Sequence, residues 1–439
     1  MDPLQGPFEF HENTSVATLL PAYTRLPPRP PPFPLTEHTF HIPGKNAHSR
    51  PWATLKLLSG ARDPKSLPTY LEGDQITGSL DMNLDESGES HIQSVKVLLR
   101  GAIVTGNEDK LDDGSMFLDV SHILWTKDKD KRRPTTPNSS SRLSGDQHWK
   151  FSIPIPKTVT LPAYPGSSNT MTYQLPHTFL ERYTRASIRY DLIVHVARGK
   201  FRVDNTLQTT FVYMPATRPP PLPSLRQIAY IENSGHLLGP EIDTEGWMTL
   251  PPFKAEVNGK QIQCSLSLAL PLSYARGSPL PLHLTLFSPQ STAVDVNNAI
   301  DIRLRRLVGF RKPPIRGEIN QHFTDMHSKE KGKVEDAAFG RWWGGGTSNN
   351  DTSVEDSVPQ SSGPDDAGTQ NFHGEIQLPR SLKPSTKITH FSVEYFVVVI
   401  PKVTPSAHST PEVPLLEQRV EVTTMFARGP KPISFAPSA

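Results

Sequence analysis

Apolar and polar side chains alternate along several short stretches of this chain. In residues 76–84, every second position is apolar or glycine, starting at Ile76, and the positions between them are polar. Residues 188–196 alternate in the same way, from Ile188 through Tyr190 to Val196. A period of two indicates a β-strand with one buried face. No stretch of comparable length has a convincing 3.6-residue period, and the 45 prolines disfavour helices. The pattern therefore predicts an all-β protein.

The strand patterns occur twice, in the same order. In the first half of the chain, a glycine-led strand, a second apolar strand, a Leu-Pro pair and a long alternating strand fall at residues 73–84, 92–101, 175–176 and 187–196. In the second half, the corresponding segments are residues 277–287, 300–309, 378–379 and 392–400. This repeat predicts two similar β domains with a cleft or seam between them. Such a seam suggests a surface that holds partners.

Composition divides the rest of the chain. Hydrophobic residues make up 35% of it, below the roughly 45–50% of an ordinary globular chain, because prolines and polar residues collect between the strand regions. We expect all-β domains of the immunoglobulin-like sandwich type, with disordered segments around them. The expected boundaries are a disordered proline-rich tail at 1–35, β-sandwiches at 36–216 and 240–425, a proline-rich linker at 217–239, a low-complexity insertion at 314–371 and a disordered tail at 426–439.

Charge and cysteine content limit the function classes. The formal net charge of +2 does not favour nucleic acid as a partner. Cys264 is the only cysteine, which precludes an intrachain disulfide and fits a reducing compartment. It alternates with leucines, so we expect it to be buried as a small hydrophobic residue. No segment resembles a signal peptide or reaches the roughly 20 apolar residues of a membrane span. These features predict a soluble cytoplasmic protein.

A series of short motifs runs through the first half of the chain. They are PTYLEGD at residues 68–74 with Gly78, VKVLLRG at 95–101, FSIP at 151–154, LPHTF at 175–179 and IRY at 188–190. In this order they resemble the arrestin family, specifically the fungal α-arrestins, which are arrestin-related trafficking adaptors. The resemblance covers most of residues 36–425 and is loose after residue 240. It implies two tandem arrestin-like β-sandwich domains.

The sharpest candidate for a binding motif is the sequence LPAY at residues 20–23. Leu20, Pro21 and Tyr23 match the Pro-x-Tyr ligands that aromatic-lined WW domains bind in an extended conformation. The alternative is a chance match in a proline-rich tail. The family resemblance implies that such a motif recruits a HECT-type ubiquitin ligase that carries WW domains.

Two further copies of the motif occur in the chain. LPTY at residues 67–70 overlaps the opening of a predicted strand, so we expect Tyr70 to be buried for structural reasons. LPAY at residues 161–164 borders a predicted loop and is a second candidate WW ligand through Leu161, Pro162 and Tyr164. Two motifs that engage one partner with several WW domains would raise the avidity about 10²–10⁴-fold over one motif.

A run of basic residues forms another candidate site. Arg303, Arg305 and Arg306 lie in a predicted strand, and Arg311 and Lys312 follow it. Such a patch could contact acidic lipid headgroups or phosphorylated tails of membrane proteins. The alternative is that these residues form the solvated face of a strand.

Motifs for catalysis and cofactor binding are missing from the sequence. There is no Gly-x-Ser-x-Gly, P-loop or dinucleotide-binding motif, and the 16 histidines show no zinc-ligand spacing. We therefore expect no catalytic, cofactor or metal site. The resemblance implies a non-enzymatic adaptor that links cytosolic tails of membrane transporters or receptors to a WW-domain ubiquitin ligase, for ubiquitin-dependent endocytosis and sorting at the plasma membrane and endosomes.

Two other interpretations of the function remain open. One is an arrestin-fold scaffold in endosomal sorting or signalling that recruits no ligase. The other is a β-sandwich module that binds a ligand or catalyses a reaction.

Overall fold

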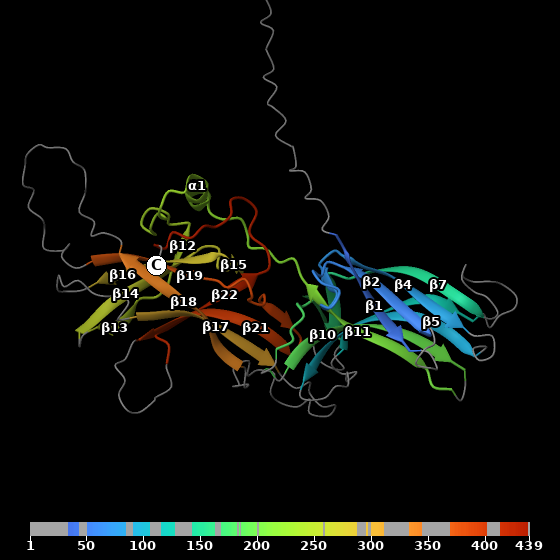
Figure 1. Cartoon of the computed structure of the whole chain (residues 1–439). Helices are drawn as coiled ribbons and strands as arrows, with labels where there is room; N and C mark the ends of the chain where they lie inside the picture. The colour runs from blue at the N-terminus through green and yellow to red at the C-terminus, as the bar shows by residue number, and fades with distance from the viewer. Residues whose placement is uncertain are drawn as a thin grey trace, which may run out of the picture.

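Two lobes built of β-strands lie side by side along the chain (Figure 1). The computed structural model describes residues 34–43, 51–84, 91–105, 116–127, 143–162, 168–181, 184, 186–199, 202–257, 260–287, 296, 300–310, 333–344, 369–401 and 413–437. The strands of the first lobe lie between residues 36 and 214, and those of the second lie between residues 247 and 423. The predicted all-β fold is confirmed.

The first lobe consists of two stacked sheets and a small hairpin. The sheets have the strand orders β1-β2-β4-β7 and β3-β11-β10-β5-β6, and β8 pairs with β9. The strands are β1 Thr36–Ile42, β2 Ala53–Ser59, β3 Thr69–Leu71, β4 Gln75–Leu84, β5 Ile92–Thr105, β6 Met116–Thr126, β7 Gly145–Pro154, β8 Thr158–Pro162, β9 Thr170–Gln174, β10 Ala186–Arg198 and β11 Asn205–Met214.

The second lobe consists of one continuous sheet with the order β12-β14-β16-β19-β18-β17-β21-β22-β15, to which β13 and β20 add short ladders. The strands are β12 Trp247–Thr249, β13 Phe253–Val257, β14 Lys260–Ala269, β15 Ser273–Ala275, β16 Pro279–Phe287, β17 Ile300–Phe310, β18 Lys333–Gly344, β19 Thr369–Gln377, β20 Thr386–Ile388, β21 Phe391–Pro401 and β22 Leu416–Thr423.

The strand order of the first lobe recurs in the second. The path β14-β16-β19 corresponds to β2-β4-β7, and the path β18-β17-β21-β22-β15 corresponds to β6-β5-β10-β11-β3. The repeat that the sequence predicts is thus present in the topology. One difference between the lobes is that β18 pairs with β19 from Gly340↔Ile376 to Gly344↔Phe372 and joins the two halves of the second lobe. Among the described strands, β6 and β7 form no such ladder.

A short tyrosine-containing strand occurs at an equivalent place in each lobe. Tyr70 in β3 and Tyr274 in β15 each lie in a strand that pairs in parallel with the last strand of its lobe. Three residues after each tyrosine, Gly73 and Gly277 adopt φ values of 93° and 82°, a conformation that favours glycine. Tyr70 is only 2% exposed, so its predicted burial is confirmed, while Leu67 is 44% exposed.

A second tyrosine is repeated in the core of each lobe. Tyr190 in β10 is fully buried, and its hydroxyl donates a hydrogen bond to the carbonyl oxygen of Pro176 at 2.7 Å. Tyr395 in β21 donates in the same way to the carbonyl oxygen of Lys383 at 2.6 Å. A buried hydroxyl needs such a partner. Cys264 is also buried, as predicted, and burial raises the pKa of its thiol to about 12.

Three segments differ from the sequence-based boundaries. The predicted linker contains helix α1, Ser224–Glu232. The predicted insertion at 314–371 contains all of β18 and the start of β19. In the predicted disordered tail, residues 426–437 pack on the second lobe, where the ring of Phe435 stacks on Tyr230 with centroids 5.9 Å apart. This last segment has no strand periodicity, and contacts of individual side chains hold it on the lobe.

Candidate functional site

The predicted site residues are only partly within the described ranges. Leu20, Pro21 and Tyr23 lie outside the described residues, as do Tyr164, Arg311 and Lys312. Leu161 and Pro162 lie in β8, and Arg303, Arg305 and Arg306 lie in β17.

The second candidate WW motif begins in a β-hairpin. Leu161 pairs with Met171, and Pro162 pairs with Thr170, at one end of the β8–β9 ladder. The Leu161 side chain is partly buried and packs against the core of the first lobe. A WW domain reads its ligand as an open polyproline II segment, whereas this half of the motif is paired as a strand. The hairpin therefore accounts for Leu161 and Pro162 structurally.

Arg303 and Arg305 do not form an unpaired cationic patch. Arg303 donates to the carboxylates of Asp301 at 2.6 Å and Asp336 at 2.8 Å, and Arg305 donates to Asp336 at 2.9 Å. Burial alone would raise the pKa of Asp336, but the two guanidinium groups hold it below its usual value. Since these charges are matched within the second lobe, β17 offers less positive potential than its sequence suggests.

Arg306 has a different position, because it reaches across to the first lobe. Its two terminal nitrogens donate to both carboxylate oxygens of Glu181, at 2.8 and 2.7 Å, and one of them also contacts Glu335. The guanidinium lies over the ring of Phe179, 5.8 Å from its centroid. Only 7% of the Arg306 side chain is exposed. A bidentate pair of this kind fixes both partners in orientation.

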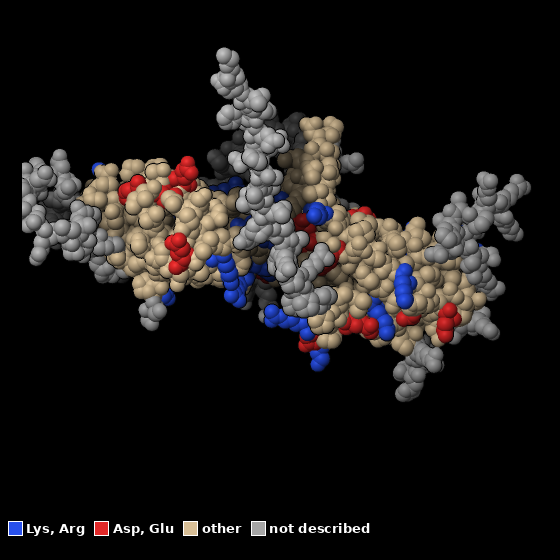
Figure 2. All heavy atoms as spheres, turned by 90° about the horizontal axis from the view of Figure 1, so that it is seen from above, with Lys and Arg blue, Asp and Glu red and all other residues tan. Residues whose placement is uncertain are grey.

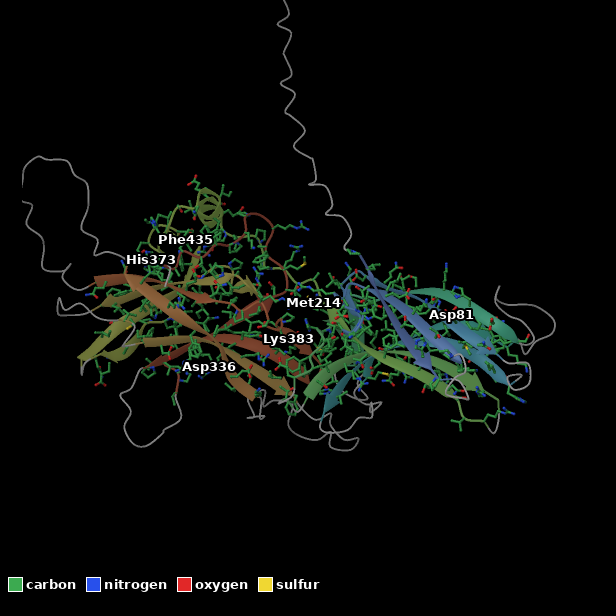
Figure 3. The ribbon with its side chains drawn as sticks, viewed as in Figure 1. Asp81, Met214, Asp336, His373, Lys383 and Phe435 are labelled. Atoms are coloured by element: carbon green, nitrogen blue, oxygen red, sulfur yellow. The ribbon has the colours of Figure 1, made fainter. Side chains whose placement is uncertain are left out.

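Apolar contact surrounds this ion pair. The ring of Phe179 meets the ring of Phe391 from the second lobe edge to face, with centroids 5.3 Å apart. Through such contacts, the buried apolar residues of both lobes form one continuous cluster. Arg276 of the second lobe donates to the sulfur of Met214 of the first lobe at 2.8 Å. Met214 and Lys383 both lie where the two lobes meet (Figure 3). We call these contacts, with Glu181 and Arg306 at their centre, the seam.

Positive charge exceeds negative charge in the seam. Burial would raise the pKa of Glu181, but Arg306 above all, and also Lys383 and Lys333, bring it below its usual value. Burial lowers the pKa of Lys383, and nearby Arg276 and Arg306 act in the same direction against Glu181. Burial also lowers the pKa of His177 to about 4, with a further contribution from Lys383 and Arg276. His177 is therefore neutral at physiological pH.

A second connection ties the end of the first lobe to the C-terminal segment. The backbone N–H groups of Thr217 and Thr424 each donate to the other residue's hydroxyl at 3.0 Å. Arg218 donates to the carbonyl oxygen of Phe426 at 2.9 Å. The covalent link at residues 215–223 is thus reinforced by contacts more than 200 residues apart in sequence. Two separate sets of contacts restrain the lobes.

Only part of the seam could be predicted from the sequence. Phe179 belongs to the LPHTF motif and Arg306 to the basic run, but nothing in the sequence connects them to Glu181, Lys383 or Arg276. Across the described ranges, no three His, Cys, Asp or Glu side chains are arranged to hold a metal ion. In the same ranges, no helix has the length and apolarity needed to cross a membrane.

A scan of the chain against protein-family models gave no match. A search of curated proteins gave none either. The fold and the seam therefore carry the functional argument, together with the motifs of the sequence.

Proposed function

We propose that this protein is a non-enzymatic adaptor of the arrestin type. In this proposal, its two lobes hold the cytosolic tail of a membrane transporter or receptor, and its N-terminal LPAY motif recruits a WW-domain ubiquitin ligase of the HECT type. Ubiquitin transfer then directs the cargo to endocytosis and sorting at the plasma membrane and endosomes.

The observation that carries this proposal is the repeated sandwich joined across a buried seam. Arg306 and Glu181 pair where the two lobes meet, and their side chains are only 7% and 24% exposed. Two β-sandwiches held in a fixed relation offer a long, preformed surface, which reduces the conformational entropy lost when a partner binds. The arrestin-like motifs in the first half of the chain also support an adaptor.

The ligase branch is tested with the full chain and a purified protein that carries several WW domains. Tyr23→Ala should abolish most of the binding, because the tyrosine fills one of the two grooves of a WW domain. Tyr164→Ala is the matched control, and the β8–β9 hairpin predicts that it changes the affinity less than twofold.

Two outcomes would contradict the ligase branch. Unchanged binding by Tyr23→Ala would remove it. Partner proteins that still co-purify with the chain after deletion of residues 1–33 would favour the alternative, an arrestin-fold scaffold that works in sorting or signalling without a ligase.

A further inference from the structure

Three histidines meet between the sheet of the second lobe and the segment that follows α1. His283 in β16 and His373 in β19 are directly opposite each other in their ladder, and their ring centroids lie 5.6 Å apart. The ring of His236, which follows α1 in the chain, lies 6.3 Å from that of His373. Figure 3 shows His373 on the side of the second lobe that carries α1. We call these three residues the histidine cluster.

Residues 234–246, which we call the covering segment, enclose His283. This residue is only 3% exposed. A Cβ placed on Gly239 would lie 3.2 Å from its Nε2 atom, so the backbone of the covering segment runs directly against the ring. The ring of Trp247 lies 6.0 Å from that of His283, and the Trp247 indole donates to the carbonyl oxygen of Leu238 at 2.8 Å. Water can therefore surround His283 only when the covering segment moves away.

The enclosed position suits a neutral imidazole. Among the residues that the structure describes, the buried Nδ1 atom of His283 has no hydrogen-bond partner. A protonated imidazole has two N–H donors, so the charged form would leave one of them unpaired in a buried place. Like charges at directly opposite positions of a ladder also repel each other. Burial lowers the pKa of both His283 and His373, and in each case a neighbouring histidine acts in the same direction.

One carboxylate opposes this effect. Glu241 of the covering segment raises the pKa of both histidines, but by less than burial lowers it. The elements packed around the cluster also carry other charged side chains, which are Arg226, Asp243, Glu245, Arg341, Glu375, Arg428 and Lys431. Figure 2 looks down on this side of the molecule and shows charges of both signs scattered over the second lobe, with no dense block of either. Of the charges described, Glu241 and the histidines themselves are those that act on the pKa of His283 and His373.

We propose that the histidine cluster is an acid-sensitive latch, which holds the covering segment on the sheet while its histidines are neutral and releases the segment when they are protonated. Hydration of a charged His283 requires the segment to lift. Arg226 of α1 donates to the carbonyl oxygen of Gly246 in this segment at 2.6 Å, so its release also weakens the attachment of the helix.

The sign of the pH dependence follows from the enclosure. The histidines bind protons more readily when the segment is open, where their pKa is about 6.5. The closed form is therefore complete above this pH and is lost as the pH falls below it. A histidine that stays neutral under the closed segment makes opening up to about tenfold more favourable at pH 5.5 than at pH 7.5.

Hydrogen exchange of the full chain, measured by mass spectrometry at pH 7.5, 6.5 and 5.5, tests the latch. Each rate is divided by the intrinsic rate of an unstructured peptide at the same pH. The backbone amides of Ile242 and Asp243 both donate to the carbonyl oxygen of Gly239. Their protection should fall about fivefold or more between pH 7.5 and pH 5.5, while that of the β10 amides falls less.

Two variants change the response in opposite directions. His283→Gln with His373→Gln removes the titrating groups, so the protection of the covering segment should change less than twofold over the same range. Glu241→Gln removes the opposing carboxylate, and the fall should then be larger than in the wild-type chain. The Glu241 side chain is exposed, so this variant keeps the fold even if the double variant does not. The matched controls are Glu245→Gln and His91→Gln, which change exposed residues and should leave the response of the wild-type chain.

Three results would overturn the proposal. The first is an equal fall of protection in the covering segment and in β10, because acid would then loosen the whole molecule. The second is a folded double variant that keeps the wild-type response. The third is a response of Glu241→Gln that equals that of Glu245→Gln, since the cluster would then not sense the nearest carboxylate.

Discussion

Two buried tyrosine hydroxyls occupy equivalent places in the two lobes. Tyr190 donates to the backbone carbonyl of Pro176, which belongs to a Leu-Pro pair, and Tyr395 donates to that of Lys383, four residues after the second pair. The bond ties an irregular connection to the central strand of its lobe. Removal of the hydroxyl leaves the carbonyl oxygen without its donor, in a buried place at Pro176 and a partly buried one at Lys383.

Removal of either hydroxyl should therefore destabilise the protein. We expect Tyr190→Phe and Tyr395→Phe each to lower the free energy of unfolding by about 1–2 kcal/mol. Urea denaturation measures this change. Tyr173→Phe is the matched control, since that hydroxyl makes only an exposed contact with the sulfur of Met171 at 3.5 Å. A loss for Tyr173→Phe equal to that for Tyr190→Phe would show that the buried bonds are not responsible.

At the scale of the element, the long strands were predictable and the helix was not. β4 alternates along its length, and β10 and β21 alternate in their first halves before a continuous apolar run, so a period of two identifies them. In α1 the buried side is formed by Arg226, Ala229 and Tyr230, while aliphatic residues face solvent. The aliphatic residues of α1, spaced by three, would have been assigned to the core, and the helix is too short for a periodic pattern to stand out. Asn233, which ends the helix with φ 52°, is a residue type that favours this position and was a local signal in the sequence.

The buried arginine of α1 gives an element-scale prediction. We expect Arg226→Met to leave the carbonyl oxygens of Leu270 and Gly246 without their donors and to loosen the attachment of the helix. Hydrogen exchange of the backbone amides in residues 224–234 should become at least tenfold faster, with little change in β10. The control is Arg419→Met, because 62% of that side chain is exposed. Uniformly faster exchange in both lobes would contradict a local role for Arg226.

At the scale of the whole molecule, the seam was predicted as a place but not as a set of contacts. The repeat of strand patterns implied two lobes, and the two lobes implied a boundary. The pairing of Arg306 with Glu181 joins residues 125 positions apart, and no periodicity encodes a contact of that range. His177 belongs to the LPHTF motif, yet Lys383 and Arg276 from the other lobe contribute to its lowered pKa.

His177 should make the stability of the molecule depend on pH. Its pKa is about 4 in the folded protein and about 6.5 when unfolded, so the unfolded chain binds more protons between these values. The free energy of unfolding should therefore fall as the pH drops from 6.5 towards 4, by up to about 3 kcal/mol from this residue. Glu181, whose pKa is lowered in the fold, adds a loss in the same direction below its unfolded pKa.

Denaturant titrations at pH 7 and pH 4.5 measure this dependence. His177→Gln should flatten the slope between the two pH values, whereas substitution of the exposed His91 by Gln should not change it. If both variants keep the wild-type slope, His177 does not control the acid sensitivity.

The ladder between β18 and β19 has a mechanical consequence. It continues the hydrogen-bonded path from one layer of the second lobe to the other, so that the layers cannot slide apart without breaking backbone hydrogen bonds. The described strands β6 and β7 of the first lobe are unbridged, and packing between its layers is nondirectional. Under load or thermal agitation, the first lobe is expected to deform first. One half of the molecule is compliant, and the other is stiff.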